Sequence, residues 1–273
     1  MKVYVCALAK NEHLYINEWV SHYFKLGVDK IFIFDNDDKD SPNIRDYIDK
    51  EYLPKIRIIN ARGIHKAKMQ HDFYNNFYYV EKDNFDWCIF CDIDEFLVGV
   101  NNIKQFLSQP RFSLFSQIRI RWKLFGDDDL IERDMSKSVM ETFTHEITSS
   151  LNRDLNKPSN LEMQGKSIIK GHLEDIRIES PHFALWGTKN RVLPSCLPSG
   201  RVCNSAVAIQ EDYSHEHIFF HHYMTKSLSE FIKQKMNRTD AVFGDRTLKL
   251  NYYWRINNKT NDKLEYLKNL GLE

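Results

Sequence analysis

The chain has 273 residues, and its 38 lysines and arginines balance 38 aspartates and glutamates. This length suits one large domain, or a core domain with a smaller appendage. The balanced charge excludes an overall field that would attract nucleic acid or an anionic membrane, so any anionic ligand must be held by a local site.

The first third of the sequence alternates strand-like and helix-like segments. Residues 3–9 form a continuous apolar run, which predicts a buried strand. Residues 14–26 carry apolar side chains at helical spacing up to Gly27, which suits a left-handed helix cap. The following predicted elements are strands over 30–34, 56–59 and 87–91, with one helix ending near Tyr52 and another over 66–81. This alternation indicates βαβ units and a parallel sheet.

After residue 100 the alternation weakens. Residues 115–125 predict a strand, and residues 127–165 are polar and irregular. Residues 167–183 suggest a hairpin, and residues 228–236 predict an amphipathic helix. No internal repeat or low-complexity linker divides the chain.

Cysteine usage and hydropathy bear on where the protein resides. The five cysteines are an odd number spread through the chain, which favours a reducing compartment. Cys88 and Cys91 have the spacing of a metal knuckle, but they lie in a predicted buried strand, where positions i and i+3 face opposite ways. No apolar run is long enough for a signal peptide or membrane span. We therefore expect a soluble, cytoplasmic protein.

Polar residues follow three of the predicted strands. Asn11 and Glu12 come after the first strand, Asp35 and Asn36 after the second, and residues 92–95 after the fourth. In parallel sheets, ligands bind beyond the carboxyl ends of the strands. We expect these side chains to meet in one crevice.

The sharpest motif is Asp92-Ile93-Asp94, because it places two hard carboxylates directly after a buried strand. Such a pair suits Mg²⁺ or Mn²⁺ bridging a diphosphate. The ion would neutralise charge on a departing nucleoside diphosphate. Asp-x-Asp also occurs on solvated loops, so its position after the strand is what favours a functional role.

Several segments together carry a family resemblance. They are Lys10-Asn11-Glu12, Glu18-Trp19, residues 33–37, Gln70, residues 87–96, residues 122–126, Pro181-His182, His222-Tyr223 and residues 226–231. In these segments the chain resembles GT-A glycosyltransferases of families 2 and 92. The likeness is strongest over residues 1–99 and 222–238 and weakest over residues 127–165.

The resemblance implies an α/β protein of the GT-A type, in which a Rossmann-like mixed sheet is flanked by helices and followed by a C-terminal helical segment. It implies a nucleotide-sugar donor, most often a UDP-sugar, and Mn²⁺ (or Mg²⁺) held through Asp-x-Asp. Asp94 would be the main ligand, with Asp92 nearer the ribose or a metal-bound water. Asn11, Glu12, Asp35 and Asn36 would hold the base and ribose, and Gln70 would line the donor pocket. Loop capping is the structural alternative for Asn11 and Asp35.

A third metal ligand in such enzymes is commonly a histidine, since neutral imidazole binds Mn²⁺. The order of segments around residues 122–182 also resembles β-1,4-galactosyltransferases, which makes His182 the first candidate. His222 is the second candidate. Lys226 could contact the diphosphate as a point charge.

An inverting transfer requires a carboxylate that accepts the proton of the acceptor hydroxyl. Asp128 is the first candidate and Asp127 the second, because they follow Gly126 where β-1,4-galactosyltransferases carry their base. A solvated acidic turn is the structural alternative. The remaining candidates are Glu174, Asp175, Glu211 and Asp212.

We accordingly expect a metal-dependent, inverting glycosyltransferase that acts on a glycan or lipid-linked acceptor. Residues 1–100 would bind the nucleotide sugar, residues 101–221 would complete the acceptor and metal half, and residues 222–273 would form the helical segment. A metal-dependent nucleotidyltransferase or phosphotransferase is one alternative, but the sequence has no glycine-rich phosphate loop. A non-catalytic carbohydrate-binding protein would leave the polar strand ends without a purpose.

The C-terminal segment 222–273 differs in charge from the rest of the chain. It holds ten lysines and arginines against six acids, a net charge of 10 − 6 = +4. Aromatic side chains interleave with these bases, which suits a membrane interface or an anionic lipid-linked acceptor. They are Tyr252, Tyr253, Trp254 and Phe243. We expect weak, salt-sensitive membrane contact, and a helical tail packed on the core is the alternative.

Overall fold

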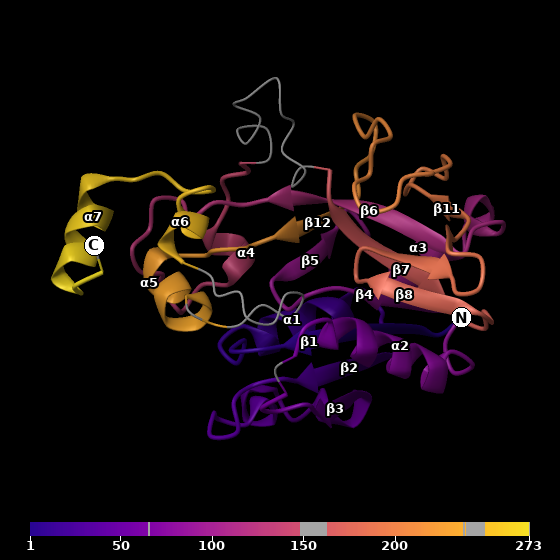
Figure 1. The fold of residues 1–273 in the computed structure, drawn as a ribbon, viewed down its shortest axis with the longest axis horizontal. Coiled ribbons are helices and arrows are strands. Elements are labelled where there is room, and N and C mark those ends of the chain that lie inside the picture. The colour runs from indigo at the N-terminus through magenta and orange to yellow at the C-terminus, as the bar shows by residue number, and fades with distance from the viewer. Residues whose placement is uncertain (65, 148–162, 237, 239–248, 273) are drawn as a thin grey trace.

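A computed structural model describes residues 1–64, 66–147, 163–236, 238 and 249–272 (Figure 1). The strands are β1 Val3–Ala9, β2 Lys30–Asp35, β3 Ile56–Asn60, β4 Trp87–Phe90, β5 Glu95–Val98, β6 Gln117–Leu124, β7 Gly165–Lys170, β8 Ile176–Ser180, β9 Phe183–Trp186, β10 Arg191–Val192, β11 Ser195–Cys196 and β12 Phe219–His222. The α-helices are α1 Ile16–Lys25, α2 Met69–Glu81, α3 Ile103–Leu107, α4 Val139–Thr142, α5 Leu228–Glu230, α6 Leu250–Tyr253 and α7 Asn261–Asn269. The 3₁₀ turns are η1 Ile44–Tyr47, η2 Leu53–Lys55 and η3 Pro110–Phe112, and a π-helical turn, η5, spans Phe231–Lys235.

One mixed sheet organises the described residues. Its strand order is β3-β2-β1-β4-β7-β6-β12-β5, and β11 pairs with β6 to one side. Strands β3, β2, β1 and β4 run parallel, which confirms the predicted parallel sheet. Strand β7 is antiparallel to both β4 and β6, whereas β12 is parallel to β6 and antiparallel to β5. The carboxyl ends of β1, β2, β4, β6 and β12 therefore lie along one edge.

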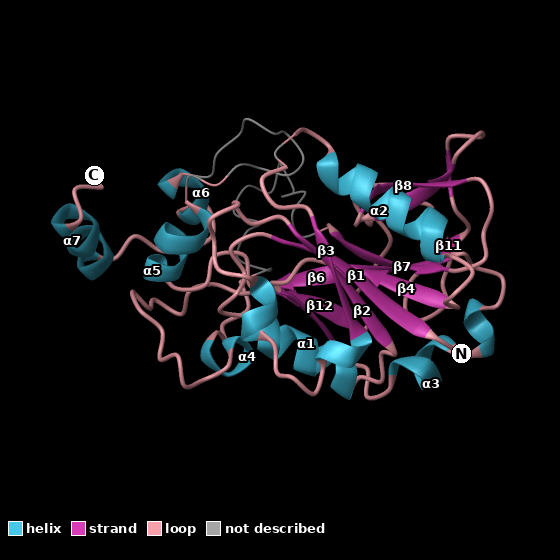
Figure 2. Ribbon diagram, turned by 90° about the horizontal axis from the view of Figure 1, so that it is seen from below, coloured by secondary structure: helices cyan, strands magenta, loops and turns pink. Residues whose placement is uncertain are grey.

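Helices cover both faces of this sheet (Figure 2). Helix α1 buries Trp19 and Tyr23 in the larger apolar cluster, and α2 buries Tyr74 and Phe77 in a second cluster across the sheet. Because successive strand residues alternate faces, β4 contributes to both clusters. This arrangement confirms an α/β protein of the GT-A type, with a mixed sheet flanked by helices.

The buried cysteines follow the same alternation. Cys88 belongs to the cluster on the α2 side and Cys91 to the cluster on the α1 side. The two thiols therefore face opposite ways, as the strand pattern predicts. All five cysteines are free and buried.

One predicted helix is wrong. The segment before Tyr52 forms the 3₁₀ turn η1 in place of a helix, and a second 3₁₀ turn, η2, follows Tyr52. Pro54 lies in the first turn of η2, and its missing N–H does not allow a helix to continue through this point. By contrast, α1 ends at Lys25, and Gly27 adopts a positive φ of 94°, as expected for a left-handed cap.

The hairpin predicted over residues 167–183 is also wrong. Strand β7 lies between β4 and β6, whereas β8 pairs with β9 in a separate three-stranded sheet. Gly171, just after β7, packs so closely on the Phe85 carbonyl that a Cβ would lie 1.9 Å from its oxygen. Asn75 of α2 exchanges two hydrogen bonds with the backbone of Ile178, so β8 is held by α2.

The C-terminal elements continue away from the sheet, and α7 lies at one end of the molecule (Figure 1). The amphipathic helix predicted over 228–236 is only partly correct, because one α-helical turn passes into the π-helical turn η5. The wider turn places Lys235 inside the protein, where it is 7% exposed. Phe243, named in the membrane prediction, lies outside the described residues.

Candidate active site

The Asp92-Ile93-Asp94 motif forms the tight connection between β4 and β5. Ile93 is buried in the core, which leaves the carboxylates on either side of it to face polar surroundings. Trp19 of α1 donates from Nε1 to the carbonyl oxygens of Asp92 and Glu95, at 3.1 Å each. Helix α1 therefore fixes the backbone that presents the carboxylates.

Asp92 is held on the α2 side of the site. Gln70 Nε2 donates to Asp92 Oδ1 at 3.1 Å, and Lys166 Nζ donates to Oδ2 at 2.6 Å. Burial alone would raise the pKa of Asp92, but the Lys166 ammonium lowers it overall. The carboxylate is therefore ionised, and Gln70 lies against it, in the region expected for the donor.

Asp94 faces the other way, toward β12 and η5. Its Oδ1 lies 3.5 Å from His222 Nε2, and Lys235 Nζ contacts its Oδ2. Burial opposes ionisation, yet the Lys235 ammonium, with His222, holds the pKa of Asp94 well below its usual value. The carboxylate is thus buried and charged.

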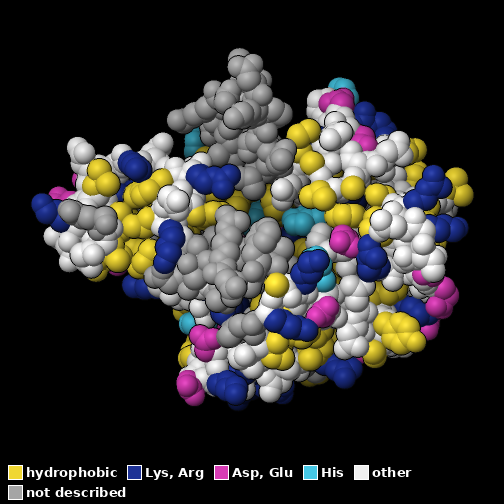
Figure 3. Space-filling model, in the orientation of Figure 1, with side chains coloured by type: hydrophobic (Ala, Val, Ile, Leu, Met, Phe, Trp, Pro, Cys, Tyr) yellow, Lys and Arg dark blue, Asp and Glu magenta, His cyan; other side chains and the backbone are white. Residues whose placement is uncertain are grey.

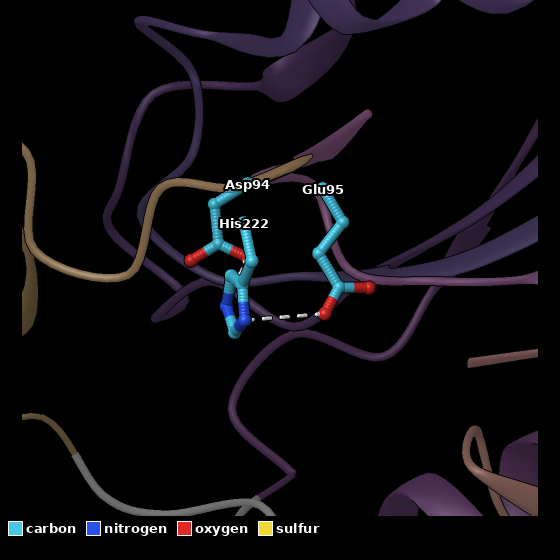
Figure 4. Close-up of side chains that lie close together, drawn as sticks. All are labelled: Asp94, Glu95 and His222. Atoms are coloured by element: carbon cyan, nitrogen blue, oxygen red, sulfur yellow. Dashed lines mark ion pairs between the residues drawn. The ribbon is translucent and has the colours of Figure 1, made fainter. Parts of the chain in front are cut away.

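Glu95 completes a group that could hold a metal ion with Asp94 and His222 (Figure 4). One ligand atom from each lies within 4.8 Å of the others. Glu95 Oε1 is 3.6 Å from His222 Nδ1, and neither atom has a hydrogen-bond partner among the described residues. Burial lowers the pKa of His222, so its imidazole is neutral and able to bind a cation. Figure 3 shows histidine, basic and acidic side chains close together near the centre of one face.

Glu95 also contacts Lys166, the lysine that holds Asp92. Glu95 is fully buried, and burial raises its pKa well above the usual value even though the Lys166 ammonium acts in the opposite direction. Glu95 Oε1 lies 3.5 Å from Lys166 Nζ, and its Oε2 accepts a hydrogen bond from the Asp92 backbone N–H at 3.0 Å. Glu95 therefore connects the Asp92 and Asp94 sides of the motif.

His182 lies beside this site but outside the three-residue group. Its Nδ1 donates to the Gly165 carbonyl oxygen at 2.6 Å, which leaves Nε2 as the acceptor. Burial, followed by the Lys166 charge, lowers the pKa of His182 to about 3. Trp122 separates the two histidines, with ring centroids 5.4 Å from His182 and 4.5 Å from His222. The geometry therefore favours His222 over His182 as the metal ligand.

Two of the four expected nucleoside contacts follow β2. Asn36 donates from Nδ2 to the carbonyl oxygens of Ala61 and Ile64, at 2.8 and 2.7 Å, so its amide holds a neighbouring loop. Asp35 Oδ2 lies 3.5 Å from Arg62 Nη1. Asp35 is thus engaged within the protein, as loop capping would require, whereas Asn36 Oδ1 has no hydrogen-bond partner among the described residues.

The other two follow β1 and meet the C-terminal segment. Asn11 has a positive φ of 57° and donates from Nδ2 to the Gln234 carbonyl at 3.3 Å. Glu12 lies 3.2 Å from Arg238 Nη1 and 3.8 Å from Lys226 Nζ. Residues more than two hundred positions apart in sequence therefore form one wall of the site.

Lys226 combines backbone strain with a buried ammonium that lacks a hydrogen bond among the described residues. Its φ is 56°, which is unusual for a residue other than glycine, and the side chain is only 2% exposed. Its Nζ has no hydrogen bond among the described residues and lies 3.9 Å from the centre of the Tyr15 ring. Burial lowers the pKa of Lys226. A buried ammonium held in this way is suited to an anionic ligand.

Asp127 is bound into a different cluster. Lys263 of α7 lies 2.6 Å from its Oδ2, Tyr253 donates its hydroxyl to the same oxygen, and Asp129 donates its backbone N–H to Oδ1 at 3.0 Å. Lys263 and Tyr253 are both fully buried, so these two residues of the basic C-terminal segment face inward, away from any membrane.

Asp128 is engaged as well. Its Oδ2 accepts from the Thr144 backbone N–H at 2.9 Å, and its Oδ1 accepts from the His145 N–H at 3.1 Å. Asp128 and Asp129 both have a positive φ, 49° and 57°, and the two hydrogen bonds to Asp128 hold the backbone of this turn. The contacts of both aspartates disfavour a role as catalytic base and favour the structural alternative, an acidic turn.

The remaining base candidates also have structural partners. Glu174 pairs with Lys82, Asp175 caps the turn at Thr188, and Asp212 accepts from Ser214. Glu211 accepts from the backbone of residues 204 and 205. None of these contacts places a carboxylate beside Asp94.

Two residues of the site, Lys166 and Lys235, were missed by reasoning on the sequence. Glu95 was expected in the crevice with residues 92–95, but its place in the group with Asp94 and His222 was not predicted. Lys166 is the second residue of β7 and Lys235 is the last residue of η5. The antiparallel pairing of β7 with β4 and the inward π-helical turn bring them to the motif. No local pattern distinguishes them from surface lysines.

Comparison with known proteins identifies the family. The sequence model of glycosyltransferase family 92 matches residues 2–192, which is well over half of the chain. No curated protein gave a significant match. Among the described residues, no helix has the length and apolar character that a bilayer span requires. The chain belongs to glycosyltransferase family 92.

Proposed function

We propose that this family 92 glycosyltransferase moves a sugar from a UDP-sugar to a hydroxyl of a glycan or lipid-linked acceptor, with inversion and with Mn²⁺ or Mg²⁺ at Asp94. The observation that carries the proposal is the group of Asp94, Glu95 and His222 directly after β4. The group lies at the strand edge where parallel sheets bind ligands, and two of its buried atoms, Glu95 Oε1 and His222 Nδ1, lack hydrogen bonds among the described residues.

The donor set suits a divalent cation. Asp94 supplies a carboxylate, and His222 presents Nε2 of a neutral imidazole to it. Glu95 faces the other ring nitrogen, as do the carboxylates that orient metal-bound histidines in other proteins. When bound, the ion would supply positive charge to the departing nucleoside diphosphate.

The residues on the α2 side would orient the donor. Gln70 and Lys166 hold Asp92 in one position, from which its carboxylate can contact the ribose or a metal-bound water. Glu12 lies just beyond β1 and would contact the nucleoside directly. Asp35 lies at the end of the neighbouring β2 and would contact the nucleoside by exchanging its contact with Arg62. Asn11 and Asn36 would shape that pocket through the segments they hold.

Lys226 would bind the diphosphate. Its buried ammonium lacks a hydrogen bond, and a phosphate oxygen would provide one. Glu12, 3.8 Å away, keeps the charge compensated before the donor binds.

The proton of the acceptor hydroxyl needs a base, and Asp128 and Asp127 remain the candidates drawn from the sequence. Either carboxylate would have to exchange its present hydrogen bonds for one to the acceptor. Substitution of Asp128, described below, tests this part of the proposal separately.

The function is tested by incubating the full chain with a panel of nucleotide sugars and Mn²⁺ and measuring nucleotide release and sugar transfer. We expect UDP release from one UDP-sugar, abolished by excess chelator. Release of pyrophosphate would identify a nucleotidyltransferase. Sugar binding without turnover would identify a carbohydrate-binding protein. Full activity in chelator would refute the metal requirement.

The acceptor could be reached at a membrane surface from the expected cytoplasmic location. Helix α7 and the residues before it expose Arg255, Lys259 and Lys268 together with Leu264 and Leu270, which are 45% and 48% exposed. Each basic residue near an anionic surface contributes about 1 kcal/mol. We expect sedimentation with anionic vesicles at low salt and its loss at high salt. A Lys259→Glu, Lys268→Glu double variant that binds as well as wild type would rule out this surface.

A further inference from the structure

Lys235 occupies an unusual place beside the proposed metal ligand. Its Nζ contacts Asp94 Oδ2 and donates to the Met224 carbonyl oxygen at 2.6 Å. The side chain is 7% exposed and reaches inward from the π-helical turn η5. His222 Nε2 lies 3.5 Å from the other oxygen of the same carboxylate. An ammonium group thus lies where a cation bound by Asp94 and His222 would have to approach.

We propose that Lys235 is a built-in counter-ion of Asp94, which a divalent cation must displace in order to bind. This inference rests on the proposed function, because it assumes that Asp94 is a metal ligand. A divalent ion and an ammonium cannot both lie against one buried carboxylate without strong repulsion, since that environment screens charge poorly. Loading the site is therefore an exchange of one cation for another.

Lys166 differs from Lys235 in a way that identifies which lysine is exchanged. Lys166 lies between two carboxylates, 2.6 Å from Asp92 Oδ2 and 3.5 Å from Glu95 Oε1. It is 1% exposed and belongs to the central strand β7. Lys235 has Asp94 as its carboxylate partner and comes from a short turn at the edge of the site. Lys235 therefore loses fewer ion pairs when it moves.

The exchange would serve the folded protein before metal arrives. A buried carboxylate without a partner is strongly unfavourable, and Lys235 keeps Asp94 charged and in position. It also lowers the affinity for the ion, because binding must break an existing ion pair. Removal of the ammonium should therefore strengthen metal binding, whereas loss of an ordinary binding residue would weaken it.

The test is Mn²⁺ binding by the full chain without donor, measured by electron paramagnetic resonance of the free ion. We expect Lys235→Met to bind Mn²⁺ about tenfold more tightly than wild type. Lys233→Met, an exposed position on the same turn, should bind as wild type does. Asp94→Asn should bind more weakly than wild type.

The outcomes separate the two hypotheses. If Asp94→Asn binds Mn²⁺ as wild type does, the proposed metal site is refuted. If Asp94→Asn weakens binding but Lys235→Met leaves it unchanged or weaker, the metal site stands and the counter-ion role is overturned.

A second measurement uses the wild-type chain, so it does not depend on the folding of a variant. Lysine acetylation followed by peptide mass spectrometry reports the accessibility of each ammonium. We expect saturating Mn²⁺ to increase the labelling rate of Lys235 several-fold and to leave Lys233 unchanged. Equal labelling of Lys235 with and without Mn²⁺ would contradict the exchange.

Discussion

Two acidic clusters in this protein have similar composition but different surroundings. The strand-end cluster, Asp92, Asp94 and Glu95 with His222, lies between β4, β5 and β12. The turn cluster, residues 127–129, lies against Lys263 of α7. Each cluster is partly buried and each contains a buried lysine partner. From the sequence alone, both are candidates for catalysis.

The two clusters differ in how completely their polar atoms are satisfied. In the turn cluster, Lys263 Nζ contacts Asp127, Asp129 and the Asn258 carbonyl, which uses all three of its donors. In the strand-end cluster, Glu95 Oε1 and His222 Nδ1 lack hydrogen bonds among the described residues. Buried polar atoms are normally paired, so unpaired ones indicate where a ligand binds. A fully paired cluster instead stabilises the fold.

The largest expected effect follows from Asp94→Asn, which removes the charged ligand at constant shape. We expect kcat for sugar transfer to fall by at least about 10³-fold, because a bound cation supplies several kcal/mol of charge stabilisation. A circular dichroism spectrum like that of wild type serves as the control for folding. Activity within tenfold of wild type would show that the strand-end cluster is not the site.

Lys263→Met, in the turn cluster, should lower stability and leave activity nearly unchanged, whereas Asp94→Asn should lower activity and leave the fold unchanged. Removing one partner of a buried ion pair costs about 3–5 kcal/mol, so the free energy of unfolding in urea should fall by that amount. At a temperature where the variant stays folded, we expect kcat to remain within about threefold of wild type. Unchanged stability together with lost activity would reverse the roles of the two clusters.

His222→Gln and His182→Gln form a matched pair of substitutions on either side of Trp122. We expect the first to weaken Mn²⁺ affinity about 10- to 100-fold, the usual range for a perturbed metal site. The second should change affinity less than threefold, because His182 lies outside the group formed by Asp94, Glu95 and His222. Isothermal titration with Mn²⁺ and UDP measures both. The reverse result would make His182 the ligand.

Asp128→Asn should have the smallest effect. Its carboxylate accepts two backbone hydrogen bonds across the turn, so we expect a stability loss of about 1–2 kcal/mol and less than a tenfold loss of kcat. A catalytic base would instead contribute about 10²- to 10⁴-fold. Single-turnover rates with the preferred donor distinguish the two, and a loss in the larger range would restore Asp128 as the base.

The sequence by itself determined the parallel half of the sheet and the place of the strand-end cluster. Strands β1 to β4 are short continuous apolar runs, and the polar residues after them are local signals that do not depend on the rest of the fold. The amphipathic pattern of residues 16–25 likewise predicts helix α1, and Gly27 predicts where it ends. Family membership was also readable from the motifs.

Tertiary structure decided which side chains meet the motif and which do not. His222 and Lys235 reach Asp94 from 128 and 141 positions away, through β12 pairing with β5 and through the π-helical turn. Lys263 reaches Asp127 from α7, and this contact favours a structural role for the acidic turn. Long-range pairing of buried charges depends on strand order and chain path. A local sequence pattern contains neither, and for that reason the position of His222 beside Asp94, the contact of Lys235 with Asp94 and the satisfied turn appear only in the folded chain.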